Sequence, residues 1–173
     1  MDKSDKLKIE REDVLELINE VEVKKKDLFL QVFDVVSKKF SENFDSLSDK
    51  GKAVMDVENR ENPLNGGVDM KVKLTGSRYL DIKGLSGGEK TLAALAFIFA
   101  IQEFTPAPFY LLDEVDAALD KHNSEKLSKL IKQYSNRAQY IVISHNDAVI
   151  TEADQIYGIS MQQGISKIIG LKL

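Results

Sequence analysis

Two short segments of the chain carry residues whose types and spacing suit phosphate chemistry. The first segment contains Ser86, Gly87, Gly88, Glu89 and Lys90. A serine followed three residues later by a glutamate is the capping box that begins many helices. A helix N-terminus also attracts anions, and two glycines would let its backbone approach phosphate oxygens closely. The two interpretations are compatible, and because a capping box alone does not require both glycines, we expect an anion site here.

The second segment is an apolar run at 109–112 that ends in Asp113 and Glu114. The run predicts a buried strand, and side chains at the carboxyl end of a parallel strand project into the crevice where α/β sheets bind ligands. An aspartate there can hold Mg²⁺, and the adjacent glutamate can act as a general base on an attacking water. On their own these residues could be a strand ending in an acidic turn. Next to the first segment, the catalytic interpretation is favoured.

Three further polar residues accompany these segments. Asp120 could cap the following helix or line a junction between subunits. His145 ends the next apolar strand, so it should reach the same crevice as Glu114 and could donate a hydrogen bond to a γ-phosphate. His122 has no obvious partner, and we expect a structural role for it. No His/Cys cluster suggests zinc.

The phosphate-binding loop of nucleotide hydrolases, G-x-x-x-x-G-K-[ST], has no match in the chain. The nearest segment is 84–91, where Lys90 and Thr91 fall correctly but Glu89 stands in place of the second glycine. A carboxylate there would bring negative charge to where backbone N–H groups must approach a polyphosphate. We therefore expect a partner polypeptide to supply the primary phosphate site.

The elements that must position these residues alternate between helix and strand. We expect a helix at 11–47, a hairpin from strands at 53–57 and 68–74, and a short strand at 78–82. A buried helix at 88–104, a strand at 109–112, a helix at 123–134 and a strand at 140–143 follow, with tail strands at 155–161 and 165–173. Apolar strands between helices predict an α/β fold with a mainly parallel sheet flanked by helices, beside a small antiparallel section.

The first helix changes character along its length. Its first part has apolar residues seven apart, a heptad-like stripe: Val14, Val21, Leu28 and Val35. Its second part has a wider aromatic face: Phe29, Phe33, Val36, Phe40 and Phe44. The helix could simply cap a domain, but the spacing favours the end of a coiled coil that enters a globular head. The helix that would pair with it lies outside the chain.

Composition excludes several classes of protein. The chain has 173 residues, an apolar fraction of 43%, no cysteine and a net charge of −4. This mild acidity argues against strong nucleic-acid binding by the chain alone, and Lys24, Lys25 and Lys26 point in different directions on a helix. No signal peptide or membrane-length apolar run is present, so we expect a soluble, intracellular protein.

As a set, these motifs resemble the C-terminal ATPase half-domain of SMC (structural maintenance of chromosomes) proteins, in the ABC ATPase class. Residues 85–90 are similar to the ABC signature, 110–114 to Walker B, 118–120 to the D-loop, and Ser144-His145 to the switch histidine. The resemblance implies that Asp113 holds Mg²⁺, Glu114 orients water, and Ser86 with Gly88 contacts the γ-phosphate of ATP held by an opposite head. It also implies that His145 senses that phosphate.

The resemblance further implies partners and boundaries. Residues 11–47 would be the coiled-coil arm and 48–173 the C-terminal half of the head, with 1–10 either the coil end or an added start. The partners would be the N-terminal half that carries Walker A, a second SMC head, a kleisin subunit, and DNA bound by the full complex. The location would be cytoplasmic and nucleoid-associated, with a function in chromosome condensation and segregation.

Two other functions compete with this one. An SMC-like ATPase of double-strand-break repair would share the signature and Walker B, but Val115-Asp116-Ala117 argues against it. A non-catalytic scaffold would use the long helix and the sheet to bind a partner. Intact Ser86 and Glu114 argue against the scaffold, because degenerate ATPases commonly lose such groups.

Overall fold

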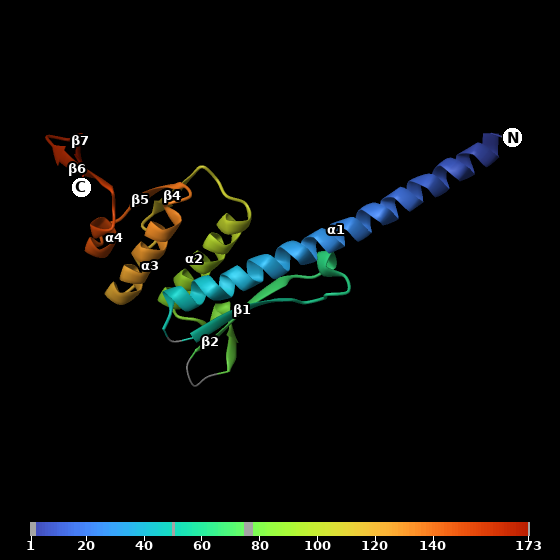
Figure 1. The fold of residues 1–173 in the computed structure, drawn as a ribbon, viewed down its shortest axis with the longest axis horizontal. Coiled ribbons are helices and arrows are strands. Elements are labelled where there is room, and N and C mark those ends of the chain that lie inside the picture. Colours follow the sequence, from blue (N-terminus) through green and yellow to red (C-terminus); the bar gives the residue numbers. More distant parts are fainter. Residues whose placement is uncertain (1–2, 50, 75–77, 173) are drawn as a thin grey trace.

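A long helix projects from a body of helices and strands in the computed structural model, which describes residues 3–49, 51–74 and 78–172. Figure 1 shows the first helix and the last hairpin at opposite ends of the long axis. The described strands form three small sheets: an antiparallel sheet in the order β1-β2-β3, a parallel pair β4-β5 and an antiparallel pair β6-β7. The predicted α/β class is confirmed, but the parallel sheet is smaller than expected because this part of the chain makes only one parallel crossover connection.

The first helix, α1, spans Lys3–Leu47 and so begins earlier than the predicted Arg11. Residues 3–10 contain no glycine or proline and are mostly good helix formers, which lets the helix extend. Positions 1 and 2 of the separate segment predicted at 1–10 lie outside the described residues. The four residues of the heptad-like stripe are all exposed, as expected for a seam whose partner helix is not in the chain.

The second part of α1 packs on the body with its aromatic face, as predicted. Phe33, Val36, Phe40 and Phe44 are buried, and the Phe40 ring lies edge-on to Phe97 at 6.4 Å. Phe29 is half-buried and stacks on Phe33. The long helix therefore divides into an arm exposed to solvent and a root that forms part of the core.

The predicted hairpin is present and lies beside the root of α1. Strand β1 (Gly51–Val57) pairs antiparallel with β2 (Val68–Leu74), and β2 pairs with β3 (Tyr79–Asp81). Short 3-10 helices lie in the connections, η1 at Pro63–Asn65 and η2 at Ile82–Gly84. Ala53, Val57 and Val72 are buried, so one face of this sheet contributes to the core.

The motif-bearing region forms the other part of the body. Its elements in order are α2 (Gly87–Phe104), β4 (Phe109–Asp113), α3 (Lys121–Tyr134), β5 (Gln139–Ile143) and α4 (Asp147–Thr151). Helix α2 was predicted to be deeply buried because it is apolar nearly all round, and this is confirmed for one side of the helix only. Leu92, Leu95 and Phe99 are buried, but Ile98 and Ile101 are exposed because the described residues place nothing against that side.

The tail strands pair with each other. Strand β6 (Gln155–Gln162) and β7 (Ile165–Lys172) form a hairpin whose turn residues, Gln163 and Gly164, both have positive φ. Such a two-residue turn matches the twist of the strands it joins. Position 173 of the predicted last strand lies outside the described residues.

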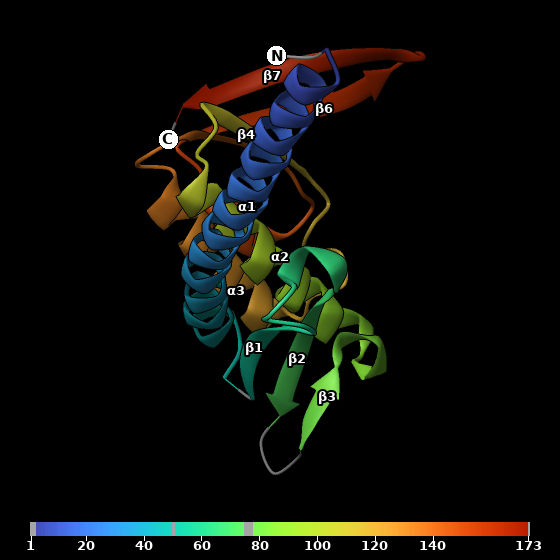
Figure 2. The same ribbon diagram turned by 90° about the vertical axis from the view of Figure 1, so that its right-hand side faces the viewer.

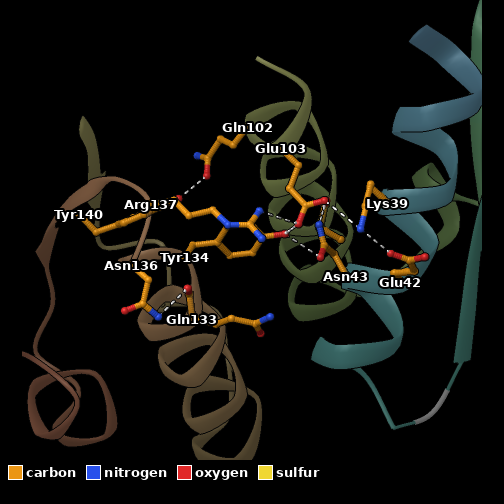
Figure 3. A network of polar contacts seen from close by, with 11 residues as sticks. Lys39, Glu42, Asn43, Gln102, Glu103, Gln133, Tyr134, Asn136, Arg137 and Tyr140 are labelled. Carbon is orange, nitrogen blue, oxygen red and sulfur yellow. Dashed lines mark hydrogen bonds and ion pairs between the residues drawn. The ribbon is translucent and has the colours of Figure 1, made fainter. Parts of the chain in front are cut away.

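A polar network joins the root of α1 to α2 and α3 (Figure 3). The Tyr134 hydroxyl lies 2.9 Å from Glu103 Oε1 and 3.1 Å from Asn43 Oδ1, and Lys39 Nζ lies 3.0 Å from Glu103 Oε2. Burial, followed by the hydrogen bond to Glu103, raises the pKa of Tyr134 to about 12. Tyr134 therefore stays neutral at physiological pH and can donate its single hydroxyl proton to Glu103, which links α3 to α2 beside α1.

Candidate nucleotide site

The predicted capping box is present at the start of α2. The Ser86 backbone N–H donates to Glu89 Oε2 at 2.9 Å, and the Ser86 hydroxyl donates to the same oxygen at 2.7 Å. The Glu89 N–H in turn donates to Ser86 Oγ at 3.4 Å. Because a carboxylate accepts but does not donate hydrogen bonds, Glu89 organises the helix start here, and a phosphate would interact with the exposed N–H groups beside it.

The two glycines of this motif have different surroundings. A Cβ atom at Gly88 would lie 3.1 Å from the Ala118 carbonyl oxygen, so a glycine lets the helix start approach the turn after β4. A Cβ atom at Gly87 would meet nothing within 4 Å. Packing within the chain therefore explains Gly88 but not Gly87, and the anion site predicted for this helix start stays a prediction. Lys90 is exposed on the first turn of α2.

Asp113 and Glu114 lie at the carboxyl end of β4, as predicted. Both side chains are exposed, and the Glu114 N–H donates to the Ile143 carbonyl at 2.9 Å, which carries the β4-β5 ladder one step further. Glu114 has a φ of 47°, in the left-handed region that few non-glycine residues adopt. Such strain of about 1 kcal/mol or more is tolerated where surrounding structure fixes the backbone, and it is common at functional sites.

His145 lies next to Glu114, which confirms that the two strand ends meet. Its Nε2 atom is 3.5 Å from Glu114 Oε1, and its side chain is 89% exposed. The parallel register explains this placement, since Asp113 pairs with Ile143 and the chain leaves both strands at the same edge.

Asp120 and His122 both act at the junction with α3. Asp120 caps α3 by accepting from the Asn123 N–H at 2.8 Å, so the capping alternative is confirmed. His122 has a partner that sequence reasoning missed: its Nε2 atom lies 2.6 Å from Asp49 Oδ2, just beyond the end of α1. The two residues are distant in the sequence, and no local pattern reveals such a pair.

Sequence reasoning also missed the contact between Asp116 and Ser144, which lies beside the predicted site. Asp116 is only 6% exposed, and its Oδ2 atom accepts from the Ser144 hydroxyl at 2.7 Å. An aspartate in an acidic turn is ordinarily taken as solvated, so its burial has no signal in the sequence.

The site as a whole is an open surface. Two hollows, of about 460 Å³ at the tip of the β6-β7 hairpin and about 220 Å³ between α1 and η1, are lined by none of the predicted site residues. Within the described residues, no group of three His, Cys, Asp or Glu side chains could hold a metal ion. Asp113 alone would suit Mg²⁺, which commonly binds one carboxylate together with substrate phosphates and waters.

No described helix has the length and hydropathy needed to cross a bilayer.

Comparison with known proteins places the chain in a family. Residues 3–167 match the family model described as RecF/RecN/SMC N terminal domain. The chain is 47% identical over 171 residues to the chromosome partition protein Smc of Pyrococcus furiosus and 45% identical over 159 residues to that of Methanocaldococcus jannaschii, covering 99% and 92% of this chain. It belongs to the RecF/RecN/SMC family. Within that family it is a region of an SMC head. The chain spans 14% and 13% of the length of those two relatives.

Solved structures agree with this placement. The Smc head domain of Pyrococcus furiosus, crystallised with an extended coiled coil and bound to the C-terminal domain of ScpA, superposes with a TM-score of 0.91 at 46% identity. That match covers 98% of this chain and 43% of the other. A structure from work on ATP-driven dimerization and DNA-stimulated activation of SMC ATPases superposes with a TM-score of 0.78 at 45% identity, covering 85% of this chain and 89% of the other.

Proposed function

We propose that this chain is the C-terminal half of an SMC head, and that it supplies the signature, Walker B, D-loop and switch motifs of an ATPase. The observation that carries this proposal is the meeting of Glu114 and His145 at adjacent strand ends in a chain that has no P-loop. In this assignment residues 11–47 belong to the coiled-coil arm, residues 48–173 form the half-head, and residues 1–10 continue the arm.

The choice of half follows from the sequence. The matching family model is named for an N-terminal domain, which would point to the part of the protein that carries Walker A. An N-terminal half needs a phosphate loop, and none is present; residues 85–90 and 109–114 instead have the composition of signature and Walker B motifs. The solved SMC ATPase chain that this chain covers to 89% is of similar length.

The proposed roles follow from the chemistry of each group. Asp113 would hold Mg²⁺, and when bound that ion would neutralise charge on the phosphates. Glu114 orients the attacking water as general base, and His145 lies close enough to share a hydrogen bond with it. Ser86, Gly87, Gly88 and Lys90 contact the γ-phosphate of ATP held by the opposite head, Glu89 keeps Ser86 in place, and Asp120 lies at the junction between heads.

Partners of the chain complete the proposal. The N-terminal half supplies the P-loop and covers the apolar face of β4-β5, and a second head supplies the nucleotide that the signature motif contacts. Relatives whose heads were solved with ScpA suggest a kleisin subunit as a further partner, and the chromosome partition proteins suggest DNA as the substrate of the full complex. We place this activity on the nucleoid in the cytoplasm.

The test is ATP turnover by the chain alone and after mixing with the Walker A half of the same protein, with sizing in the presence of ATP. We expect no turnover by the chain alone, and both turnover and ATP-dependent pairing in the mixture. Turnover by the highly purified chain alone would mean that it holds its own phosphate site. A well-formed complex without turnover would favour the scaffold function instead.

A further inference from the structure

The Walker B turn and the switch loop are connected by one side chain-to-side chain hydrogen bond. Asp116 lies two residues after Glu114 and is almost completely buried, although its neighbours Asp113 and Asp120 are exposed. Its carboxylate accepts from the Ser144 hydroxyl at 2.7 Å, and Ser144 directly precedes His145. Burying a carboxylate costs free energy unless polar partners compensate, so this position has a specific role in the packing.

Ser144 is held on both sides. Its hydroxyl donates to Asp116 and accepts from the Asn146 N–H at 2.9 Å. The Asn146 side chain in turn caps α4 by accepting from the Ala148 N–H at 3.0 Å. The residues on either side of His145 are therefore fixed, whereas the His145 side chain is 89% exposed and makes little contact that could fix it.

The same turn also reaches the signature motif. The Asp116 carbonyl accepts from the Leu119 N–H at 2.9 Å, and the Ala118 carbonyl lies where a Cβ atom on Gly88 would come within 3.1 Å. A turn fixed at Asp116 thus lies between the start of α2, the strained Glu114 and the switch loop. A shift of this turn would change the spacing of all three motifs.

We propose that Asp116 is a positioning residue that holds the switch loop through Ser144, so that His145 stays beside Glu114 during hydrolysis. This inference rests on the proposed function. It assigns no contact with nucleotide to Asp116. The neutral amide of an asparagine could accept the same hydrogen bond, whereas alanine could not. Comparing the two variants therefore distinguishes a role of the hydrogen bond from a role of the negative charge of Asp116.

The experiment compares Asp116→Ala, Asp116→Asn, Ser144→Ala and the double alanine variant in the complex with the Walker A half. We expect Asp116→Ala to lower kcat at least about tenfold with KM for ATP within about twofold, since the group acts through the reacting residues and not on substrate binding. Asp116→Asn should restore kcat to within about threefold of wild type. The double variant should be no slower than the slower single variant, because both changes break one connection. Asp45→Ala, at an exposed aspartate near the end of α1, is the matched control.

A second readout uses the 173-residue chain and does not depend on turnover. NMR signals of the His145 backbone and ring should shift and lose order in Asp116→Ala and in Ser144→Ala, and recover in Asp116→Asn. If His145 signals move as expected while no form of the complex hydrolyses ATP, the proposed function fails and the positioning contact stands. Unchanged His145 signals in folded Asp116→Ala or Ser144→Ala, or single effects that multiply in the double variant, would overturn the inference.

Discussion

At the scale of single residues, Glu114 is the group on which the proposed chemistry depends. Its left-handed backbone, the ladder hydrogen bond to Ile143 and the nearby His145 together hold a carboxylate at an open strand end. These features suit a general base that must receive a proton from the water molecule that attacks the nucleotide. A merely structural acidic turn would not need a strained glutamate beside an exposed histidine.

Glu114→Gln tests that role directly. We expect the complex with the Walker A half to bind ATP as tightly as wild type and to hydrolyse it at least about a hundredfold more slowly, because the amide cannot take a proton. ATP binding by fluorescence titration and single-turnover hydrolysis would measure the two effects separately. Turnover at the wild-type rate would remove Glu114 from the mechanism.

Variants of Gly87 and Gly88 can test ligand contact and packing within the chain separately. Gly88→Ala should destabilise the chain by about 1–2 kcal/mol because the new methyl group meets the Ala118 carbonyl, whereas Gly87→Ala should change stability by less than about 0.5 kcal/mol. Chemical denaturation of both variants would measure this difference. If a phosphate approaches at Gly87, the Gly87→Ala variant should still lose ATP-dependent head pairing. Normal pairing by that variant would restrict the motif to its capping role.

At the scale of elements, much of the fold was predictable because the signals were local. The period of α1, the capping box of α2 and the turn between β1 and β2 each depend on residues close in the sequence. The sequence could not predict the exposed side of α2, the burial of Asp116 or the His122–Asp49 pair, because each depends on which distant segments pack together. The proximity of Glu114 and His145 is the exception, because the carboxyl ends of neighbouring parallel strands lie at the same edge of a sheet and this alone predicted it.

The junction of α1 with α3 should depend on pH. Asp49 follows the end of α1 and lies 2.5 Å from Lys126 Nζ and 2.6 Å from His122 Nε2. The hydrogen bond from Lys126, followed by that from His122, lowers the pKa of Asp49 below its usual value. A carboxyl whose pKa is lower in the folded state stabilises the fold above its unfolded pKa of about 3.9, and this contribution is lost as pH falls through the folded pKa. The junction should therefore be intact near neutrality and weaken below about pH 4.

Asp49→Asn gives the corresponding measurement. Its unfolding free energy should be lower than wild type at pH 6, and the difference should shrink as the pH falls below about 4. Asp45→Asn, near the end of the same helix, is the control and should show little difference from wild type at either pH. A gap between wild type and Asp49→Asn that stays constant from pH 6 to pH 3 would contradict the charged junction.

At the scale of the whole molecule, the described residues leave apolar surface uncovered where a partner is expected. One face of the β4-β5 pair packs on the core through Tyr110, Leu112, Tyr140 and Val142. The opposite face carries exposed apolar residues: Phe109, Leu111, Ile141 and Ile143. A parallel pair is normally covered on both faces, so we expect a further layer on this one. Figure 2 shows the β6-β7 hairpin at the end of the molecule opposite the β1-β2-β3 sheet. Apolar side chains are also exposed on the β6-β7 hairpin and along the heptad-like stripe of α1.

Leu111 and Leu112 are adjacent in sequence but point to opposite faces of β4. Variants of the two residues can therefore distinguish an effect on assembly from an effect on folding. Leu111 is 61% exposed and Leu112 is 7% exposed. We expect Leu111→Lys to leave the unfolding free energy of the chain within about 0.5 kcal/mol of wild type but to weaken its association with the Walker A half at least about tenfold, because a lysine would be buried in the completed head. Leu112→Lys should instead unfold the chain, since it places a charge in the core. Circular dichroism and calorimetric titration would measure folding and association. If Leu111→Lys binds the other half as tightly as wild type, this face is not where the head is completed, and the missing layer of the sheet must be sought on another surface.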